Sequence, residues 1–389
     1  MIYIVTYIII TLSMVYFNSI DRKATVSWLL SVIIILGLIV GLADMLGGYD
    51  RYIYCDLFDS CVDMLIDGQS LLLQDNVLMQ SDYEFAYVYL NILIAHITDN
   101  RYIFVFIVTI IIYTLLFNSF RTYFDDYPMA MVLFLALYFF FTFTYLRQSL
   151  AVAFSWFSYR YVIEKRFFPF FICAFLAYKF HNSAIIFFPL YFIPAKKFSR
   201  GTILWVVLIA FIIGITGITT KLYGMYGEMT DTVHRVSQYE EAGNDFRIEY
   251  VIEVIVFLYF ILKRYDKIPS ERYHLVFLNS SLVFFTILLL FVKSATAGRQ
   301  TWYYMLGLIY TLNYITSGKS KTARNYRLMV YIVCTLLFLR IVYSWGEMLN
   351  PYKTFLTNGS RENDHIHDSY EYDSNYDRDK FYRLIIHLK

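Results

Sequence analysis

Charged residues are scarce in this sequence. Only 16% of its 389 residues are Asp, Glu, Lys or Arg, whereas 59% are hydrophobic, and the mean hydropathy is +0.51. A single globular core could not bury apolar runs of this extent, so the composition excludes a soluble globular domain. It predicts an all-α, polytopic integral membrane protein.

The motifs of nucleotide-dependent and zinc enzymes are also missing. The chain has no Walker loop, no dinucleotide-binding glycine fingerprint, no zinc-protease helix motif and no serine-hydrolase elbow. The sequence therefore implies no cofactor and no metal. The net charge of +2 comes from separate short basic clusters rather than one patch, so nucleic acid is not indicated as a partner.

Cysteine is rare as well, with four residues in the chain. Cys173 and Cys334 fall inside apolar runs. Cys55 and Cys61 share a polar stretch, and they can form a disulfide if that stretch is extracytoplasmic; two free thiols are the alternative. The first apolar run lacks a basic leader and a small-residue cleavage site, which predicts a retained span rather than a signal peptide.

Apolar runs long enough to approach a membrane span recur along the chain, without an internal repeat. About 30 Å of hydrocarbon requires about 17 to 22 such residues. Twelve spans are predicted, at 2–18, 26–42, 102–120, 129–145, 149–162, 167–178, 182–193, 202–219, 250–262, 273–292, 302–315 and 326–344. The three short ranges between 149 and 193 predict tilted or broken helices around residues 147–193.

Residues 82–96 form a further, weaker candidate. This segment has one apolar face and a polar end, so it either lies in the interface as an amphipathic or re-entrant segment or crosses as a thirteenth span. If it does not cross, every basic cluster falls on one side, which the positive-inside rule makes cytoplasmic.

The resulting topology divides the chain into two parts. Residues 1–357 form the multi-pass domain, with outer loops at 44–101 and 221–249. Residues 358–389 form a polar C-terminal tail, which we expect to be a flexible, solvated extension because it is rich in Asp, Ser and Tyr.

Several basic side chains gather on the predicted outer face, at or just before inward-running helices. This placement opposes both the helix dipole and the positive-inside rule, so we expect an anion to compensate it. Helix N-termini joined by guanidinium groups suit a phosphate or diphosphate. The residues are Arg147, Lys179, His181, Arg247 and Arg299.

Simpler interpretations exist for the same residues. Arg147 can reach the lipid headgroups or pair with an outer acid such as Asp50 or Glu84. His181 can be a hydrogen-bonded interface residue, and Arg299 can anchor a turn beside an aromatic belt.

Sequence motifs point to a family. The segment RQSLA beginning at Arg147, followed by KFHNSAIIFFPLYF beginning at Lys179, resembles the EpsG-type members of the Wzy-like polymerases. These multi-pass bacterial proteins polymerise repeat units of O-antigen, capsule or exopolysaccharide. GYDRYIYCDLF, EFAYVYLNILI and NPYKTFL also resemble segments of that family, and together these matches cover most of the chain.

The resemblance implies glycosyl transfer on the extracytoplasmic face of the bacterial inner membrane. The growing glycan would move from undecaprenyl diphosphate to a lipid-linked repeat unit, and a flippase and a chain-length regulator would act in the same pathway. Arg147 and Arg299 would stabilise the departing diphosphate, and His181 would act as base or hydrogen-bond donor. Asp50 and Glu84 are alternative bases. The further residues predicted to bind diphosphate are Gln148, Lys179, Asn182 and Arg247.

Two other functions remain open at this level. A glycan ligase would use similar chemistry, and a flippase would carry the lipid-linked oligosaccharide without joining it. A transporter is expected to place polar groups near the bilayer midplane and often has repeated halves. The clustering of cations at one face favours the enzyme.

Overall fold

The computed structural model describes residues 1–44, 49–69, 84–219, 221–222, 246–294, 297–357 and 379–386. These parts of the chain are helical and contain no β-strand, apart from an isolated antiparallel bridge between Ala43 and Thr354. The predicted all-α class is therefore correct. The chain forms two compact units. The first comprises residues 1–157, 176–182 and 332–389, and the second residues 158–175 and 183–331.

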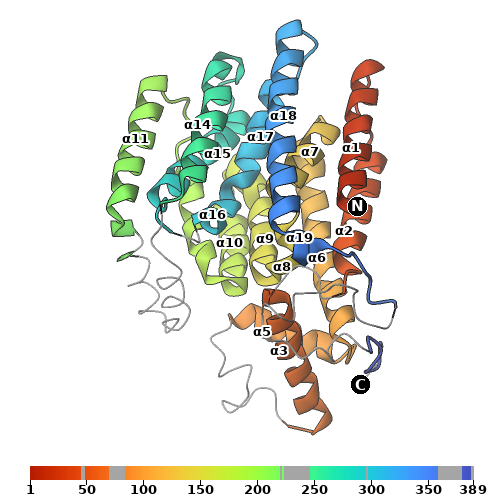
Figure 1. Cartoon of the computed structure of the whole chain (residues 1–389). Coiled ribbons are helices and arrows are strands. Elements are labelled where there is room, and N and C mark those ends of the chain that lie inside the picture. The colour runs from red at the N-terminus through yellow and green to blue at the C-terminus, as the bar shows by residue number, and fades with distance from the viewer. Residues whose placement is uncertain are drawn as a thin grey trace. The chain divides into compact units, whose positions relative to one another are not determined.

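Upright helices form most of the first unit (Figure 1). Helix α2 packs on α6, and α1 packs on α7. Polar side chains cap three of these helices: Thr25 accepts a hydrogen bond from the N–H of Trp28 before α2, Asn100 accepts one from Tyr102 before α6, and Asp126 accepts one from Met129 before α7. The helices with residues in this unit are α1 (Ile2–Ser19), α2 (Val26–Gly41), α6 (Arg101–Tyr123), α7 (Tyr127–Leu137), α8 (Phe141–Thr144), α9 (Leu146–Ile163), α10 (Phe167–Phe180), α18 (Lys321–Ser344) and α19 (Gly346–Leu349).

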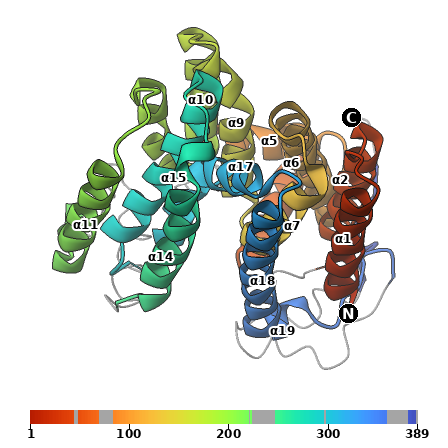
Figure 2. The same ribbon diagram turned by 90° about the horizontal axis from the view of Figure 1, so that it is seen from above.

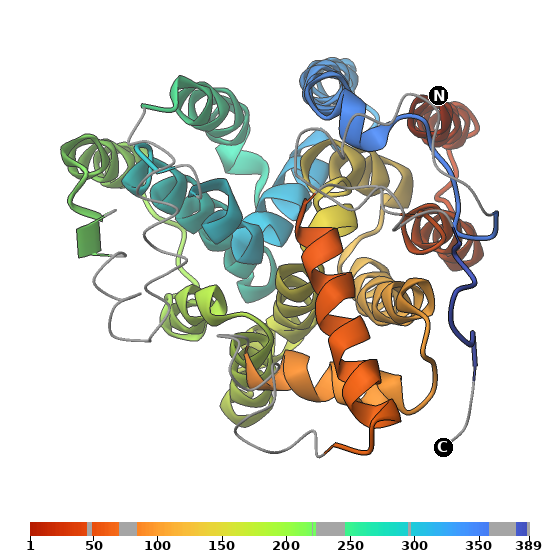
Figure 3. The same cartoon turned by 60° about the horizontal axis from the view of Figure 1, so that its bottom comes forward.

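Two further helices of the first unit occupy the stretch predicted as an outer loop at 44–101. Helix α3 (Tyr49–Ile66) and helix α5 (Phe85–Ala95) contact each other at one end of α6 and α8, and α5 crosses α3 (Figures 1 and 3). Helix α5 has 11 residues and spans about 16 Å, half of what a crossing requires. The geometry thus favours the interfacial or re-entrant interpretation of residues 82–96.

The cysteines of α3 do not form a disulfide. Cys55 and Cys61 lie six residues apart on the same helix, and both are free and buried. Burial raises the pKa of each thiol to about 12, so neither is a reactive thiolate at neutral pH. Of the two alternatives for this pair, the structure has the free thiols.

The second unit is built around α15 (Arg272–Leu290), which lies between α11 and α17 (Figure 2). Glycine makes two of these contacts possible, because a Cβ at Gly214 would collide with the backbone of Leu289, and one at Gly307 would meet Ser280 at 2.5 Å. The other elements are α11 (Arg200–Thr216), α14 (Ile248–Lys263), η2 (Tyr265–Lys267), α16 (Ala297–Thr301), η3 (Trp302–Tyr304) and α17 (Met305–Thr316).

Residues 182–192 form a long 3₁₀-helix, η1 (Asn182–Phe192), rather than an α-helix. Pro189 lies inside it and supplies no backbone N–H, which disfavours the α-helical ladder. Within the second unit, Ser183 and Tyr303 share a hydrogen bond of 2.7 Å, and the Tyr304 hydroxyl donates to the carbonyl of Ile186. Of the three short ranges predicted as tilted or broken helices, 182–193 is irregular, whereas α9 and α10 are continuous α-helices of 18 and 14 residues.

A second irregularity was not predicted. The range 129–145 is interrupted where α7 ends at Leu137 and α8 begins at Phe141. The interrupting residues Tyr138, Phe139 and Phe140 are buried aromatic side chains with no Gly or Pro among them. Packing rather than a local helix breaker produces this interruption, so the sequence carries no signal for it.

The protein is an integral membrane protein. Four helices in the described ranges are long and apolar enough to cross a bilayer, namely α1, α6, α15 and α18, and several shorter apolar helices accompany them. Large apolar side chains point outward on the helix surfaces; Trp205, for example, is 65% exposed. Helices occur in all twelve predicted ranges, but the predicted number of about twelve spans is not confirmed.

The end of the predicted polar tail packs against the first unit. Residues 379–386, which we call the C-terminal strap, include Lys380, whose buried amino group pairs with buried Asp44 at 2.9 Å. The expectation of a flexible extension is wrong for this segment, because a buried ion pair holds it. Residues 358–378 and 387–389 of the tail lie outside the described residues, as do residues 223–245 of the predicted 221–249 loop.

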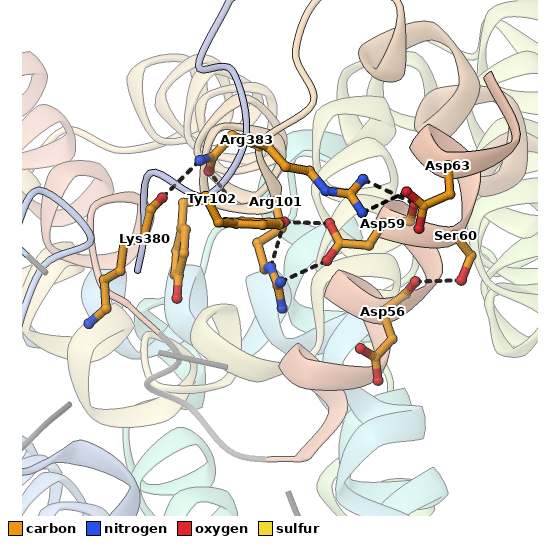
Figure 4. Close-up of polar contacts among 10 residues, drawn as sticks. Asp56, Asp59, Ser60, Asp63, Arg101, Tyr102, Lys380 and Arg383 are labelled. Carbon is orange, nitrogen blue, oxygen red and sulfur yellow. Dashed lines mark hydrogen bonds and ion pairs between the residues drawn. The ribbon is translucent and has the colours of Figure 1, made fainter. Parts of the chain in front are cut away.

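Two aspartates of α3, Asp59 and Asp63, and Arg101 of α6 hold the rest of the strap (Figure 4). Arg101 pairs with Asp59 at 2.8 Å, and Tyr382 donates to Asp59 at 2.6 Å while accepting from Arg101 at 2.7 Å. Arg383 pairs with Asp63 at 2.7 Å. The strap therefore ties α3 to the start of α6.

Candidate active site

Glu84 lies immediately before α5, at the position where a short polar side chain such as Asp or Ser would cap the helix. Its backbone carbonyl accepts the first helical hydrogen bonds, from the N–H groups of Tyr87 at 2.9 Å and Val88 at 3.2 Å. Its carboxylate makes no capping hydrogen bond to α5. The side chain is therefore available to groups outside its own helix.

The Glu84 carboxylate joins two segments that lie far from it in the sequence. One oxygen accepts a hydrogen bond from the guanidinium Nη1 of Arg147, the second residue of α9. The other oxygen accepts from the backbone N–H of Asn182, at 2.9 Å, where η1 begins. Both charged side chains are more than nine-tenths buried. A buried charge pair of this kind fixes both partners, because neither can be rehydrated in place.

Two adjacent tyrosine rings lie beside the Arg147 guanidinium. Its Cζ lies 5.5 Å from the ring centroid of Tyr54 on α3 and 5.8 Å from that of Tyr87 on α5. The two rings meet edge to face, with centroids 5.6 Å apart. The negative faces of aromatic rings attract a guanidinium, and their bulk restricts its rotamers. Arg147 is therefore held in a defined position by one carboxylate and two aromatic rings.

The ionisation of Glu84 follows from these neighbours. Burial alone would raise its pKa, but the nearby Arg147, His181 and the Asn182 N–H outweigh that effect and hold the pKa below its ordinary value of 4.5. Glu84 is thus an anion at neutral pH, which makes it a weak proton acceptor. The arrangement fits a positioning partner for Arg147 better than a general base.

His181 directly follows α10, and its backbone N–H donates to the carbonyl of Ala177 at 2.9 Å. The ring is half-buried, and its charge contributes to the lowered pKa of Glu84. Arg147, His181 and Asn182, which were predicted from separate segments, are therefore brought together around Glu84. The structure thus has Arg147 paired with an acid, as one of the simpler interpretations predicted.

The other candidates of the first unit occupy neighbouring positions in the sequence. Gln148 is buried on α9, and Lys179 is half-buried near the end of α10, with its amino group 5.4 Å from the ring centroid of Tyr178. Asp50 is half-buried in the first turn of α3. Glu84, not Asp50, is the acid that pairs with Arg147.

Sequence reasoning missed Arg51, which is almost completely buried. Its guanidinium donates to the backbone carbonyls of Val40, Ala43 and Phe143, the shortest distance being 2.8 Å to Ala43. Arg51 thereby ties the start of α3 to the ends of α2 and α8. The sequence analysis also missed Tyr54 and Tyr87, the two rings beside Arg147. Tyr87 follows Glu84 by three residues, which is the spacing that places side chains on one face of a helix.

Arg247 and Arg299 belong to the second unit. Arg247 precedes α14, and its backbone N–H donates to the carbonyl of Val292 at 3.0 Å, while Arg299 lies half-buried in the short helix α16. Tyr250 hydrogen-bonds to the backbone of Gly298. The segments that carry the two arginines therefore adjoin within this unit.

Comparison with known proteins gives one match. The model of the EpsG family matches residues 26–354, which is most of the chain and includes every candidate residue above. No curated protein and no solved structure matches the chain.

Proposed function

The chain belongs to the EpsG family, which is associated in general with Wzy-like polysaccharide polymerases, and from this premise we propose that it joins lipid-linked repeat units. A hydroxyl oxygen of the incoming repeat unit attacks the anomeric carbon of the growing glycan. The new glycosidic C–O bond forms as the C–O bond to undecaprenyl diphosphate breaks. The diphosphate leaves with the bonding electrons, and a base takes the hydroxyl proton.

The position of Arg147 is the observation that carries this proposal. A departing diphosphate gains negative charge, and a cation fixed in advance stabilises that charge without reorganising during the reaction. Arg147 is buried at the start of α9 and held by Glu84, Tyr54 and Tyr87. Its guanidinium can contact two phosphate oxygens at once.

The remaining roles follow from charge and exposure. His181, half-buried beside the ion pair, takes the acceptor proton or donates a hydrogen bond to the diphosphate. Gln148, Lys179 and Asn182 are the further candidates for binding the diphosphate in the first unit, and Arg247 and Arg299 of the second unit are candidates from the sequence alone. Glu84 orients Arg147, and Asp50 is the alternative acceptor of the proton.

The proposed setting is the inner membrane of a bacterium, with the site on its extracytoplasmic face. Both the glycan donor and the glycan acceptor are oligosaccharides linked to undecaprenyl diphosphate. A flippase would supply it, and a chain-length regulator would act on the product. This placement agrees with the basic clusters, which the positive-inside rule assigns to the cytoplasm.

Elongation by purified protein tests the proposal. Lipid-linked repeat units are added to the protein in detergent, where no compartments exist, and product length is measured. We expect wild type and Arg121→Ala, which removes an exposed arginine at the end of α6, to make long chains. Arg147→Ala, His181→Ala and Arg299→Ala should insert but make no long chains, and Tm recorded for each variant separates loss of activity from loss of stability.

Two outcomes would contradict the proposal. Full elongation by Arg147→Ala would show that this residue does not stabilise the departing diphosphate. Translocation of repeat units across vesicles by a wild-type protein that never elongates them would indicate a flippase, and transfer of finished glycan to another acceptor would indicate a ligase.

A further inference from the structure

A buried arginine ends helix α14 in the second unit. Arg264 follows Lys263, the last residue of α14, and only 4% of its surface is exposed. Its backbone is fully used, because its N–H donates to Ile261 at 3.2 Å and its carbonyl accepts from Lys267 at 3.0 Å. Its side chain, by contrast, makes no hydrogen bond to the described residues.

None of the three guanidinium nitrogens of Arg264 has a hydrogen-bond partner among the described residues. The group lies against one aromatic ring, with its Cζ 4.9 Å from the ring centroid of Tyr326 on α18. A cation–π contact replaces only part of the hydration that a guanidinium loses on burial. A buried cation without hydrogen bonds is unfavourable unless an anion joins it.

The surroundings of Arg264 are basic. Exposed Lys263 and Lys267 lie on the α14 side, and Arg324 and Arg327 lie on either side of Tyr326 in α18. The one acidic side chain in this turn, Asp266, is paired with Arg200 at 2.5 Å. Basic residues thus adjoin Arg264 and Tyr326 in the sequence, and no carboxylate among the described residues hydrogen-bonds to the Arg264 guanidinium.

We propose that Arg264 and Tyr326 bind the phosphate of an anionic phospholipid headgroup from the cytoplasmic leaflet. The planar guanidinium matches phosphate oxygens in a two-pronged contact, which an ammonium does not. Entry requires the half-exposed Tyr326 ring to turn away from the guanidinium. The site stands independently of the glycosyl transfer proposed above.

The helix surfaces beside the site favour a lipid over soluble phosphate as the source of this group. Ile252, Ile255 and Tyr259 form an outward stripe on α14, each more than half exposed, which ends at Lys263. Leu328 on α18 is exposed as well. Acyl chains can follow these side chains while the headgroup reaches the basic cluster, which the sequence predicts on the cytoplasmic side.

Purified protein in a zwitterionic detergent tests the site. Phosphatidylglycerol, phosphatidylcholine and inorganic phosphate are each titrated, while thermal unfolding and lipid retained in native mass spectrometry are recorded. We expect phosphatidylglycerol alone to raise Tm and to be retained. Arg264→Gln should weaken its binding about tenfold to hundredfold. Lys267→Gln, which removes the same charge from an exposed position, should bind nearly as wild type.

Stability without lipid provides a second readout. Because Arg264→Gln removes a buried cation that has no hydrogen-bond partner in the described chain, its Tm in lipid-free detergent should equal or exceed that of wild type. A large loss of Tm there would mean that the guanidinium is structural, which would overturn the proposal. Equal phosphatidylglycerol binding by Arg264→Gln would also overturn it. Stabilisation by inorganic phosphate matching that by the lipid would refute the lipid source.

Discussion

At the scale of single residues, Arg147 depends on shape as well as on charge. Its guanidinium is planar, contacts Glu84 through Nη1 and lies beside two adjacent tyrosine rings. A lysine at this position would keep the charge but would lose the planar fork and the contact with both rings. The two substitutions Arg147→Lys and Arg147→Ala therefore separate geometry from charge.

We expect Arg147→Lys to lower kcat about tenfold to hundredfold, and Arg147→Ala about a hundredfold to a thousandfold, because the contact forms fully only with the departing diphosphate. Elongation rates of the purified variants measure this. Arg121→Lys is the matched control and should elongate at the wild-type rate. A wild-type rate for Arg147→Lys would show that charge alone suffices.

Glu84 gives a prediction for pH. Its pKa lies below 4.5 in the folded protein, so its ion pair stabilises the fold above pH 4.5, and the stabilisation is lost as the pH falls through the lowered pKa. Glu84→Gln leaves Arg147 buried without its carboxylate, which should destabilise the protein by about 3 kcal/mol at neutral pH.

Unfolding of wild type and Glu84→Gln at several pH values between 7 and about 3 tests this expectation. The difference in Tm should be present above pH 4.5 and should shrink as the pH falls below it. Glu164→Gln removes a half-exposed partner of Arg166 and should change Tm little at any pH. A difference that persists unchanged to pH 3 would show that packing, not charge, is what Glu84 contributes.

At the scale of helices, glycine sets how closely α15 and α17 approach. A side chain at Gly307 would meet Ser280 and the carbonyl of Phe277, at 2.5 and 2.7 Å. Since the Phe277 carbonyl belongs to the backbone of α15 and cannot rotate away like a side chain, α15 and α17 must separate to admit even a methyl group. We expect Gly307→Ala to lower the free energy of unfolding by about 1–3 kcal/mol.

Gly201→Ala is the control for this substitution, because Gly201 is also helical but its nearest neighbour to an added Cβ is 3.8 Å away. It should be neutral or stabilise by up to about 1 kcal/mol, since alanine favours helix. Denaturant or thermal unfolding of both variants in one detergent makes the comparison. Equal stability of the two would contradict close packing at Gly307.

Most helices could be located from sequence because each is an apolar run bounded by charged or capping residues. Helix α3 could not, since Asp50, Arg51, Asp56, Asp59 and Asp63 interrupt it and no apolar run exists. Its apolar side chains nevertheless recur at helical spacing, and they are buried: Tyr52, Cys55, Phe58 and Val62. A search for membrane-length apolar runs misses such a helix.

The candidate site was predictable only in part, for a related reason. Basic residues at helix starts oppose the helix dipole and the positive-inside rule, and this conflict identified Arg147 and His181 as candidates. Whether Asp50 or Glu84 pairs with Arg147 could not be predicted, because it depends on the orientation of α3 and α5. Asn182 contributes a backbone N–H to Glu84, which no side-chain pattern can reveal.

At the scale of the whole molecule, the last described segment of the chain returns to its first third. The family match ends at residue 354, and the C-terminal strap follows it. The strap binds Asp44 ahead of α3, Asp59 on α3 and Arg101 at the start of α6. Since α3 and α5 carry Tyr54, Tyr87 and Glu84, the strap supports the segment that holds Arg147.

The Lys380 and Asp44 pair at the start of the strap allows a decisive test. Both side chains are fully buried, so removing either leaves the other charged and without solvent. Lys380→Met or Asp44→Leu alone should each destabilise the protein by about 3–5 kcal/mol, whereas the double variant should recover most of that loss, because an apolar pair has no charge to desolvate. Thermal unfolding of the four proteins gives the coupling free energy directly.

Arg383→Gln, which breaks the more exposed pair with Asp63, is the control, and it should cost less than about 1 kcal/mol. A double variant no more stable than either single one would mean that the strap is held by its other contacts. If the double variant is stable and still elongates glycans, the buried pair is a structural clasp; if it is stable but inactive, the strap positions α3 and α5 for Arg147.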